Sequence, residues 1–135
     1  MTPEQFLATR FNALMNGDYQ AVYQSYHDAS PFRQHFASAE DYIHFAEQHL
    51  GQIKLKHWEI VDQRHVEKDQ IECLLMMEMQ LEDSSQFFYE SALLILADDQ
   101  WHYHSAQKLG PDDYPGPPER ISFTHFDQVA EKIRF

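Results

Sequence analysis

The chain has 135 residues and a mass of 16.0 kDa, which is the size of a single domain. Its 10 Lys and Arg residues against 22 Asp and Glu residues give a formal net charge of −12 at pH 7, which argues against nucleic acids and anionic membranes as partners. Hydrophobic residues make up 43% of the chain, enough for a packed core and too many for a disordered protein. No apolar run reaches the roughly 18 residues of a membrane span, and the start lacks a signal stretch, so we expect a cytoplasmic protein.

The reactive residue types exclude several kinds of site. Cys73 is the only cysteine, so the chain has no internal disulfide and no cysteine-built zinc site, and we expect an inert thiol in the core. The sequence contains no glycine-rich phosphate loop, no serine-protease order of residues and no His-Glu-x-x-His motif. We therefore expect no cofactor, and disfavour kinase, serine hydrolase and zinc protease activities.

The first fifty residues carry apolar side chains at helical spacing. Each of three segments begins after a Thr, Asp or Ser whose side chain suits a helix N-cap, and in the first segment a proline follows at the first helical position. Glycines end the first and third segments, and a Ser-Pro pair ends the second. The predicted helices are bounded by Thr2 and Gly17, by Asp18 and Ala29, and by Ser38 and Gly51.

After Gly51 the apolar spacing changes from 3.6 residues to 2, which predicts strands. A polar turn at residues 83–85 and a two-residue hairpin loop at Asp98-Asp99 separate the last three of them. The predicted strands run from Ile53 toward Arg64, over Ile71–Leu81, over Phe87–Leu96 and over Trp101–Leu109. Helices followed by long strands predict an α+β fold in which three N-terminal helices pack on one face of an antiparallel sheet.

The C-terminal stretch differs in composition. Residues 110–118 hold four of the six prolines and two of the four glycines, which does not suit a strand and predicts an extended arm. Thr124 and Asp127 resemble a capping box for a short terminal helix with Phe126, Val129, Ala130 and Ile133 on one face. We therefore divide the chain into a domain over residues 1–109 and an arm with a short helix over residues 110–135.

The element order, together with the Asp-Asp-x-Trp-x-Tyr end of the sheet, resembles the nuclear transport factor two-like superfamily. A closer resemblance is to the middle domain of the YchJ-like bacterial proteins, carried by residues 10–18 (Arg-Phe-Asn-Ala-Leu-Met-Asn-Gly-Asp), by Tyr26-His27, and by Glu90 eleven residues before Trp101. It spans roughly residues 6–109, and the cysteine-rich zinc-binding ends of that family are missing here. The resemblance implies a cone-shaped, cystatin-like fold, a cavity between helices and curved sheet, and a homodimer, but no particular reaction.

A two-residue loop at Asp98-Asp99 pairs Leu96 with Trp101, Leu94 with Tyr103 and Glu90 with Gln107. One face of the hairpin then mixes aromatic rings with a carboxylate, a hydroxyl and an amide, a combination suited to a small-molecule pocket. The predicted pocket residues are Glu90, Trp101, Tyr103, Gln107, Tyr26 and Trp58. A carboxyl among apolar side chains can act as general acid or base, so Glu90 is the candidate catalytic residue; the alternative is a structural Glu90 bonded to helix backbone or to Arg10.

The opposite face of the hairpin carries His102 and His104, two potential metal ligands on one strand. A third ligand would have to come from another strand, for example His57 or His65, so we favour an exposed or interface pair and no metal. Met76, Met77 and Met79 fit either an adaptable binding surface or packing in a core or dimer interface.

Three functions remain open from the sequence. The favoured one is a homodimeric domain that binds a small, partly apolar molecule. The second is a cofactor-independent isomerase, dehydratase or hydrolase that uses Glu90 or a pocket histidine as the proton carrier. The third is a protein-interaction module that acts through the arm at residues 111–118 and the terminal helix.

Overall fold

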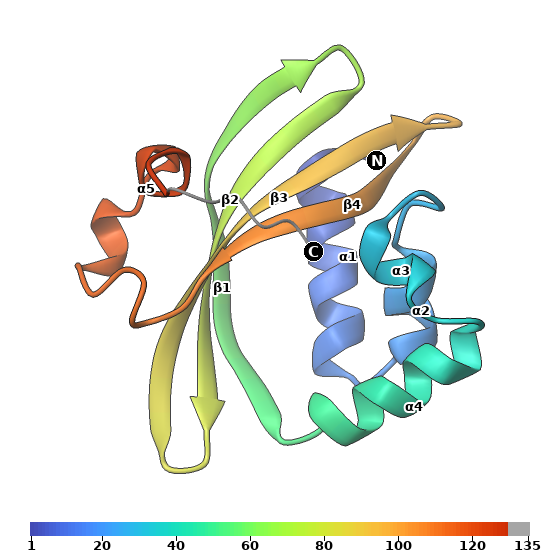
Figure 1. The fold of residues 1–135 in the computed structure, drawn as a ribbon, viewed down its shortest axis with the longest axis horizontal. Helices are drawn as coiled ribbons and strands as arrows, with labels where there is room; N and C mark the ends of the chain where they lie inside the picture. Colours follow the sequence, from blue (N-terminus) through green and yellow to red (C-terminus); the bar gives the residue numbers. More distant parts are fainter. Residues whose placement is uncertain (130–135) are drawn as a thin grey trace.

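The computed structural model describes residues 1–129 and has an α+β fold with four helices on one face of a four-stranded antiparallel sheet (Figure 1). A C-terminal segment with a 3-10 helix and a fifth α-helix lies on the other face. The helices are α1 (Pro3–Met15), α2 (Tyr19–Gln24), α3 (Pro31–Gln34), α4 (Ala39–His49), η1 (Pro118–Arg120) and α5 (Phe123–Asp127). The strands are β1 (Ile53–Glu67), β2 (Gln70–Leu81), β3 (Ser84–Ala97) and β4 (Gln100–Leu109).

The helix boundaries follow the capping residues in the sequence. The Thr2 hydroxyl accepts a hydrogen bond from the Gln5 N–H at 3.1 Å, and the Gln5 side chain accepts one from the Thr2 N–H at 2.9 Å, which completes a capping box. The side chains of Asp18 and Ser38 cap α2 and α4, as predicted, by accepting hydrogen bonds from the backbone N–H groups of Ala21 and Asp41. The short helix α3 was not predicted; Ser30 caps it immediately after the break that ends α2.

The sheet has the order β1-β2-β3-β4, so each strand pairs with its neighbour in the chain. The predicted two-residue loop between β3 and β4 is confirmed: Asp98 and Asp99 have φ angles of 54° and 61°, as a type I′ turn requires. Beyond β4, a single parallel bridge joins Tyr26 to Tyr103. The Tyr103 N–H donates to the Ser25 carbonyl at 2.9 Å, which partly covers the free edge of β4.

A bulge in β4 overturns part of the predicted register. Leu96 pairs with Trp101 and Leu94 with Tyr103, as predicted, but the register shifts by one residue at His104. Glu90 consequently pairs with Lys108 and not with Gln107. Because successive side chains of a strand point to opposite faces, this shift moves the predicted pocket residue Gln107 to the face away from the helices.

A second bulge reverses the predicted alternation in β1. The period of two placed His57 on the same face as Ile53 and Leu55. The register shifts between Leu55 and His57, and Trp58 packs into the core on the helix side in place of His57. A one-residue insertion of this kind leaves no signal in a pattern of alternating residues.

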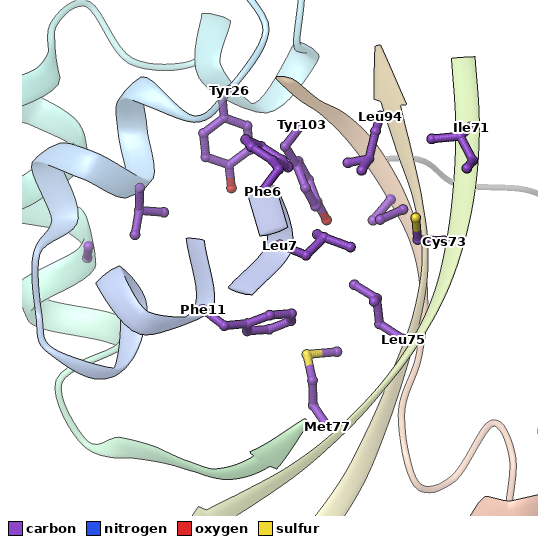
Figure 2. Close-up of a cluster of buried hydrophobic side chains, with 14 of the residues drawn as sticks. Phe6, Leu7, Phe11, Tyr26, Ile71, Cys73, Leu75, Met77, Leu94 and Tyr103 are labelled. Carbon is purple, nitrogen blue, oxygen red and sulfur yellow. The ribbon is translucent and has the colours of Figure 1, made fainter. Parts of the chain in front are cut away.

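The sheet is covered on both faces, and each face has its own apolar cluster. The helix-side core joins Leu7 and Phe11 of α1 to Cys73, Leu75 and other residues of the sheet (Figure 2). The outer cluster packs the C-terminal segment against the other face, and its largest fully buried members are Tyr89, Phe126 and Leu74. The segment over residues 111–129 therefore packs on the sheet of the preceding residues.

The terminal helix begins two residues earlier than predicted, because Ser122 and not Thr124 is its N-cap. Phe123 is its first residue, and the Ser122 N–H donates to His125 Nδ1 at 3.1 Å, whereas Thr124 and Asp127 were the expected capping pair. Ala130 and Ile133 of the predicted apolar face lie outside the described residues. No helix within residues 1–129 has the length and apolar character to cross a bilayer.

Candidate functional site

A cluster of polar side chains lies between α1, the end of α2 and the hairpin of β3 and β4. We call Arg10, Ser25, Tyr26, Glu90 and Tyr103 the polar cluster. Arg10 donates from Nε to the Ser25 hydroxyl at 3.1 Å and from Nη2 to the Tyr26 hydroxyl at 3.0 Å. Its guanidinium carbon also lies 3.9 Å from the centre of the Tyr103 ring, a cation–π contact. Arg10 thereby ties α1 to α2 and to β4.

Glu90 joins the cluster through Tyr103. The Tyr103 hydroxyl donates a hydrogen bond to Glu90 Oε2 at 2.9 Å, and Lys108 Nζ lies 4.0 Å from Glu90 Oε1. The Glu90 side chain is 15% exposed, so it lies mostly inside the protein. Glu90 has no direct hydrogen bond to Arg10 among those described, and the link between the two runs through the Tyr103 ring. One Glu90 oxygen therefore accepts a hydrogen bond from Tyr103, and the other lies near the Lys108 cation.

Burial and neighbouring groups shift the pKa values of Tyr103 and Arg10. Burial raises the pKa of Tyr103 well above its usual value, and the Glu90 carboxylate raises it further. Burial opposes the charge on Arg10, but the neighbouring Tyr26, Tyr103 and Glu90 outweigh that effect and raise the pKa of Arg10. The phenol keeps its proton and Arg10 its charge, which suits a fixed network that holds helices on the sheet.

The structure brings together three of the six predicted pocket residues, namely Tyr26, Glu90 and Tyr103. Trp101 packs at the edge of the helix-side core, near the hairpin end of β4. Trp58 lies in the distant edge strand β1, where its ring stacks on Phe11 at 4.4 Å. Gln107 is on the outer face of the sheet because of the β4 bulge.

On the outer face, the Gln107 amide donates a hydrogen bond to the Phe126 carbonyl at 2.9 Å. Sequence reasoning named Arg10 only as an alternative partner of Glu90, and it missed Ser25 and Lys108. Arg10 is the first residue of the segment 10–18 that carries the family resemblance, and this was the sequence feature that could have identified it as a site residue.

A hollow of about 560 Å³ lies between the helices and the sheet, away from the polar cluster. It is formed where α1 and α4 end, α2 and β1 begin, and β2 finishes, and we call it the helix-end hollow. Its walls are mainly apolar, and Lys54 and Asn16 supply polar groups. The apolar wall residues include Leu14, Tyr19, Leu50, Ile53, Leu55 and Met79.

The helix-end hollow and Glu90 are separate places on the sheet. Glu90 pairs with Leu75, whereas Met79 lies four residues further along β2, which is roughly 13 Å in a strand. Of the six predicted pocket residues, none lines this hollow. Of the three methionines considered for an adaptable binding surface or for packing, Met79 lines the hollow, whereas Met76 and Met77 are buried.

The two histidines named as possible third ligands lie away from His102 and His104. His27 lies beside His102 and His104, with ring centres 5.9 and 6.0 Å apart, whereas His57 and His65 lie in the distant strand β1. Within residues 1–129 no group of three or more His, Cys, Asp or Glu side chains is placed to hold a metal ion. Cys73 is fully buried, and burial raises the pKa of its thiol to about 12, so it is protonated and unreactive.

A second polar group, on the outer face, was not predicted. Arg64 donates to both carboxylate oxygens of Asp127 at 2.9 Å and to Glu72 at 3.2 Å, and its guanidinium lies over the Phe123 ring at 4.2 Å. Glu72 also accepts a hydrogen bond from the Ser91 hydroxyl at 2.9 Å. These contacts fasten α5 to β1 and β2, so this group has a structural role.

Neither protein-family models nor curated proteins give a match to this chain.

Proposed function

We propose that the chain binds a small, partly apolar molecule in the helix-end hollow, as a cytoplasmic protein of the nuclear transport factor two-like superfamily. The observation that carries the proposal is the hollow itself. Its volume of about 560 Å³ falls within the range of small-molecule sites, roughly 300–1,000 Å³. Its apolar walls supply binding energy, and the few polar groups orient a ligand.

The walls suit a ligand with one charged or polar end. Lys54 lies at the rim, is exposed, and takes part in no ion pair within residues 1–129. The Met79 side chain is flexible and polarizable, so that wall can adjust to ligands of different shape. An apolar body against Leu55 and Met79 with an anionic group near Lys54 is therefore the arrangement we favour.

Binding is favoured over catalysis because of where the proton-carrying groups lie. Glu90, the candidate general acid or base, is bonded to Tyr103 and is roughly 13 Å along the sheet from Met79. No histidine lines the hollow, and general acid–base catalysis needs a group within hydrogen-bond reach of the reacting atom. An isomerase, dehydratase or hydrolase would need a second site near Glu90.

The fluorescent anion 1-anilinonaphthalene-8-sulfonate has an apolar body and one sulfonate, and is therefore a suitable probe. Met79→Trp fills the hollow, whereas Val66→Trp adds the same ring at an exposed position of β1 outside it. We expect Met79→Trp to weaken probe binding about tenfold, Lys54→Gln about threefold, and Val66→Trp hardly at all. Equal binding by the two tryptophan variants would exclude the hollow as the site.

We also propose that the chain forms a homodimer, as the resemblance implies. Light scattering of the purified chain tests this assembly directly. A particle mass near twice 16.0 kDa supports the dimer, and a mass near 16.0 kDa contradicts it. The outcome leaves the ligand proposal unaffected, because all walls of the helix-end hollow come from one chain.

A further inference from the structure

The C-terminal segment leaves part of the outer face of the sheet uncovered, and this part is hollowed. The hollow has a volume of about 530 Å³ and is bordered by β1, β2, β3 and η1. We call it the outer trough. Val61, Met76 and Phe87 supply its apolar surface, and Glu59, Glu78 and Glu119 are its carboxylates. It lies on the opposite face of the sheet from the helix-end hollow.

The apolar surface of the trough is a continuation of the outer cluster. Phe87 packs against that cluster and Met76 belongs to it, while Ile121, Phe123 and Phe126 cover the rest. Pro118 and Glu119 are the residues of the C-terminal segment that line the trough. Val61 is 38% exposed and lines the trough together with Met76, which is 7% exposed. The trough is thus an apolar surface that the chain itself does not close.

Carboxylates outnumber basic side chains around this surface, where His57 is the one basic residue in the described lining. Three carboxylates line the trough, and no lysine or arginine does. Glu59 bonds to His57 at 3.0 Å, but Glu78 and Glu119 take part in no ion pair within residues 1–129. The net charge of −12 adds to the local field, so cations gather here and phosphates and anionic lipids are repelled.

We propose that the outer trough binds a short basic peptide segment of a partner protein, in which an apolar side chain is flanked by lysines or arginines. The apolar side chain packs on Met76 and Phe87, and the cations pair with Glu59, Glu78 and Glu119. Charge complementarity selects this occupant over a second copy of the chain, which carries the same net charge of −12. Long basic side chains can lie along the apolar surface with their charged ends at the rim.

The test uses the full chain and a rhodamine-labelled peptide, Gly-Lys-Lys-Phe-Lys-Lys-amide, measured by fluorescence anisotropy. The triple variant Glu59→Gln, Glu78→Gln, Glu119→Gln removes the charges of the trough. The matched triple variant Glu40→Gln, Glu47→Gln, Glu67→Gln removes three exposed carboxylates elsewhere and changes the net charge equally. We expect the trough variant to weaken binding about tenfold and the matched variant less than threefold, with stronger binding at low salt.

Two further measurements separate the trough from simple charge attraction. Replacing the peptide phenylalanine with serine, and the substitution Val61→Thr, should each weaken binding several-fold, because both reduce the apolar contact. Equal losses in the two triple variants, equal binding of the phenylalanine and serine peptides, or no binding at low salt would each overturn the proposal. A change of oligomeric state in the trough variant alone would also overturn it, by showing that a second copy occupies the trough.

Discussion

Arg10 lies against the face of Tyr103, with its guanidinium carbon 3.9 Å from the centre of the ring. The hydroxyl of the same tyrosine donates a hydrogen bond to Glu90 on the neighbouring strand. One aromatic side chain therefore connects a cation from α1 with a carboxylate from β3, and the two charges meet through Tyr103 and not in a direct ion pair. This arrangement favours a structural role for Glu90.

The first prediction concerns this link. Arg10→Met removes two hydrogen bonds and the cation–π contacts with Tyr26 and Tyr103, and we expect it to lower the free energy of unfolding by about 2 kcal/mol. Glu90→Gln keeps an acceptor for Tyr103 and should cost about 1 kcal/mol or less. Urea denaturation of the two single variants and the double variant measures their coupling, which we expect to be about 0.5–1 kcal/mol.

Arg120→Met serves as the control for the loss of an arginine, because Arg120 is exposed on η1 and should change stability by less than about 0.5 kcal/mol. Strictly additive effects of Arg10→Met and Glu90→Gln would contradict the link through Tyr103. A large effect of Glu90→Gln on a measured activity, with unchanged stability, would instead favour the catalytic interpretation.

The second prediction concerns the C-terminal segment. Phe126 is fully buried in the outer cluster, so Phe126→Ala should lower the free energy of unfolding by about 3 kcal/mol. Thr124→Ala changes an exposed residue of the same helix and should change stability by less than about 0.5 kcal/mol. Similar stabilities of the two variants in urea would mean that α5 does not pack on the sheet in solution.

Because the segment packs on the sheet, deleting residues 111–135 would be a poor test of whether they act as a protein-interaction module. Removing the segment uncovers Leu74, Tyr89 and Leu109, which are buried beneath it. A newly exposed apolar surface promotes association by itself. Point variants such as Phe126→Ala and the trough variants are therefore better tests of the interaction function than a deletion.

The fold was largely predictable from the sequence because its boundaries rest on local chemistry. Thr2, Asp18 and Ser38 each accept a hydrogen bond from the backbone N–H three residues away, so nearby sequence determines where these helices begin. The tight turn at Asp98-Asp99 is likewise decided by its two residues and their flanking strands. Such signals do not depend on the rest of the chain.

The candidate site was less predictable because its geometry depends on contacts between distant segments. The bulge at His104 moved Gln107 to the outer face, and no residue near it marks a bulge in the sequence. The helix-end hollow joins the ends of elements from Leu14 to Met79, so no short motif describes it. Glu90 and Tyr103 were correctly placed on one face, because the predicted register holds from the turn as far as Tyr103, before the bulge at His104.

The last prediction is a loss of stability at alkaline pH. Burial raises the pKa values of Tyr42, Tyr89 and Tyr103 above the ordinary value of about 10. Between that value and the folded pKa values, the unfolded chain loses phenol protons that the folded chain keeps. The folded state then binds more protons, so the free energy of unfolding is unaffected below about pH 10 and falls as the pH rises above it. Urea denaturation and phenolate absorbance at about pH 9 and pH 11 measure both effects. Tyr103→Phe should remove one phenol of raised pKa and flatten the pH dependence of the free energy of unfolding. Titration of all seven tyrosines near pH 10 without loss of stability would contradict the prediction.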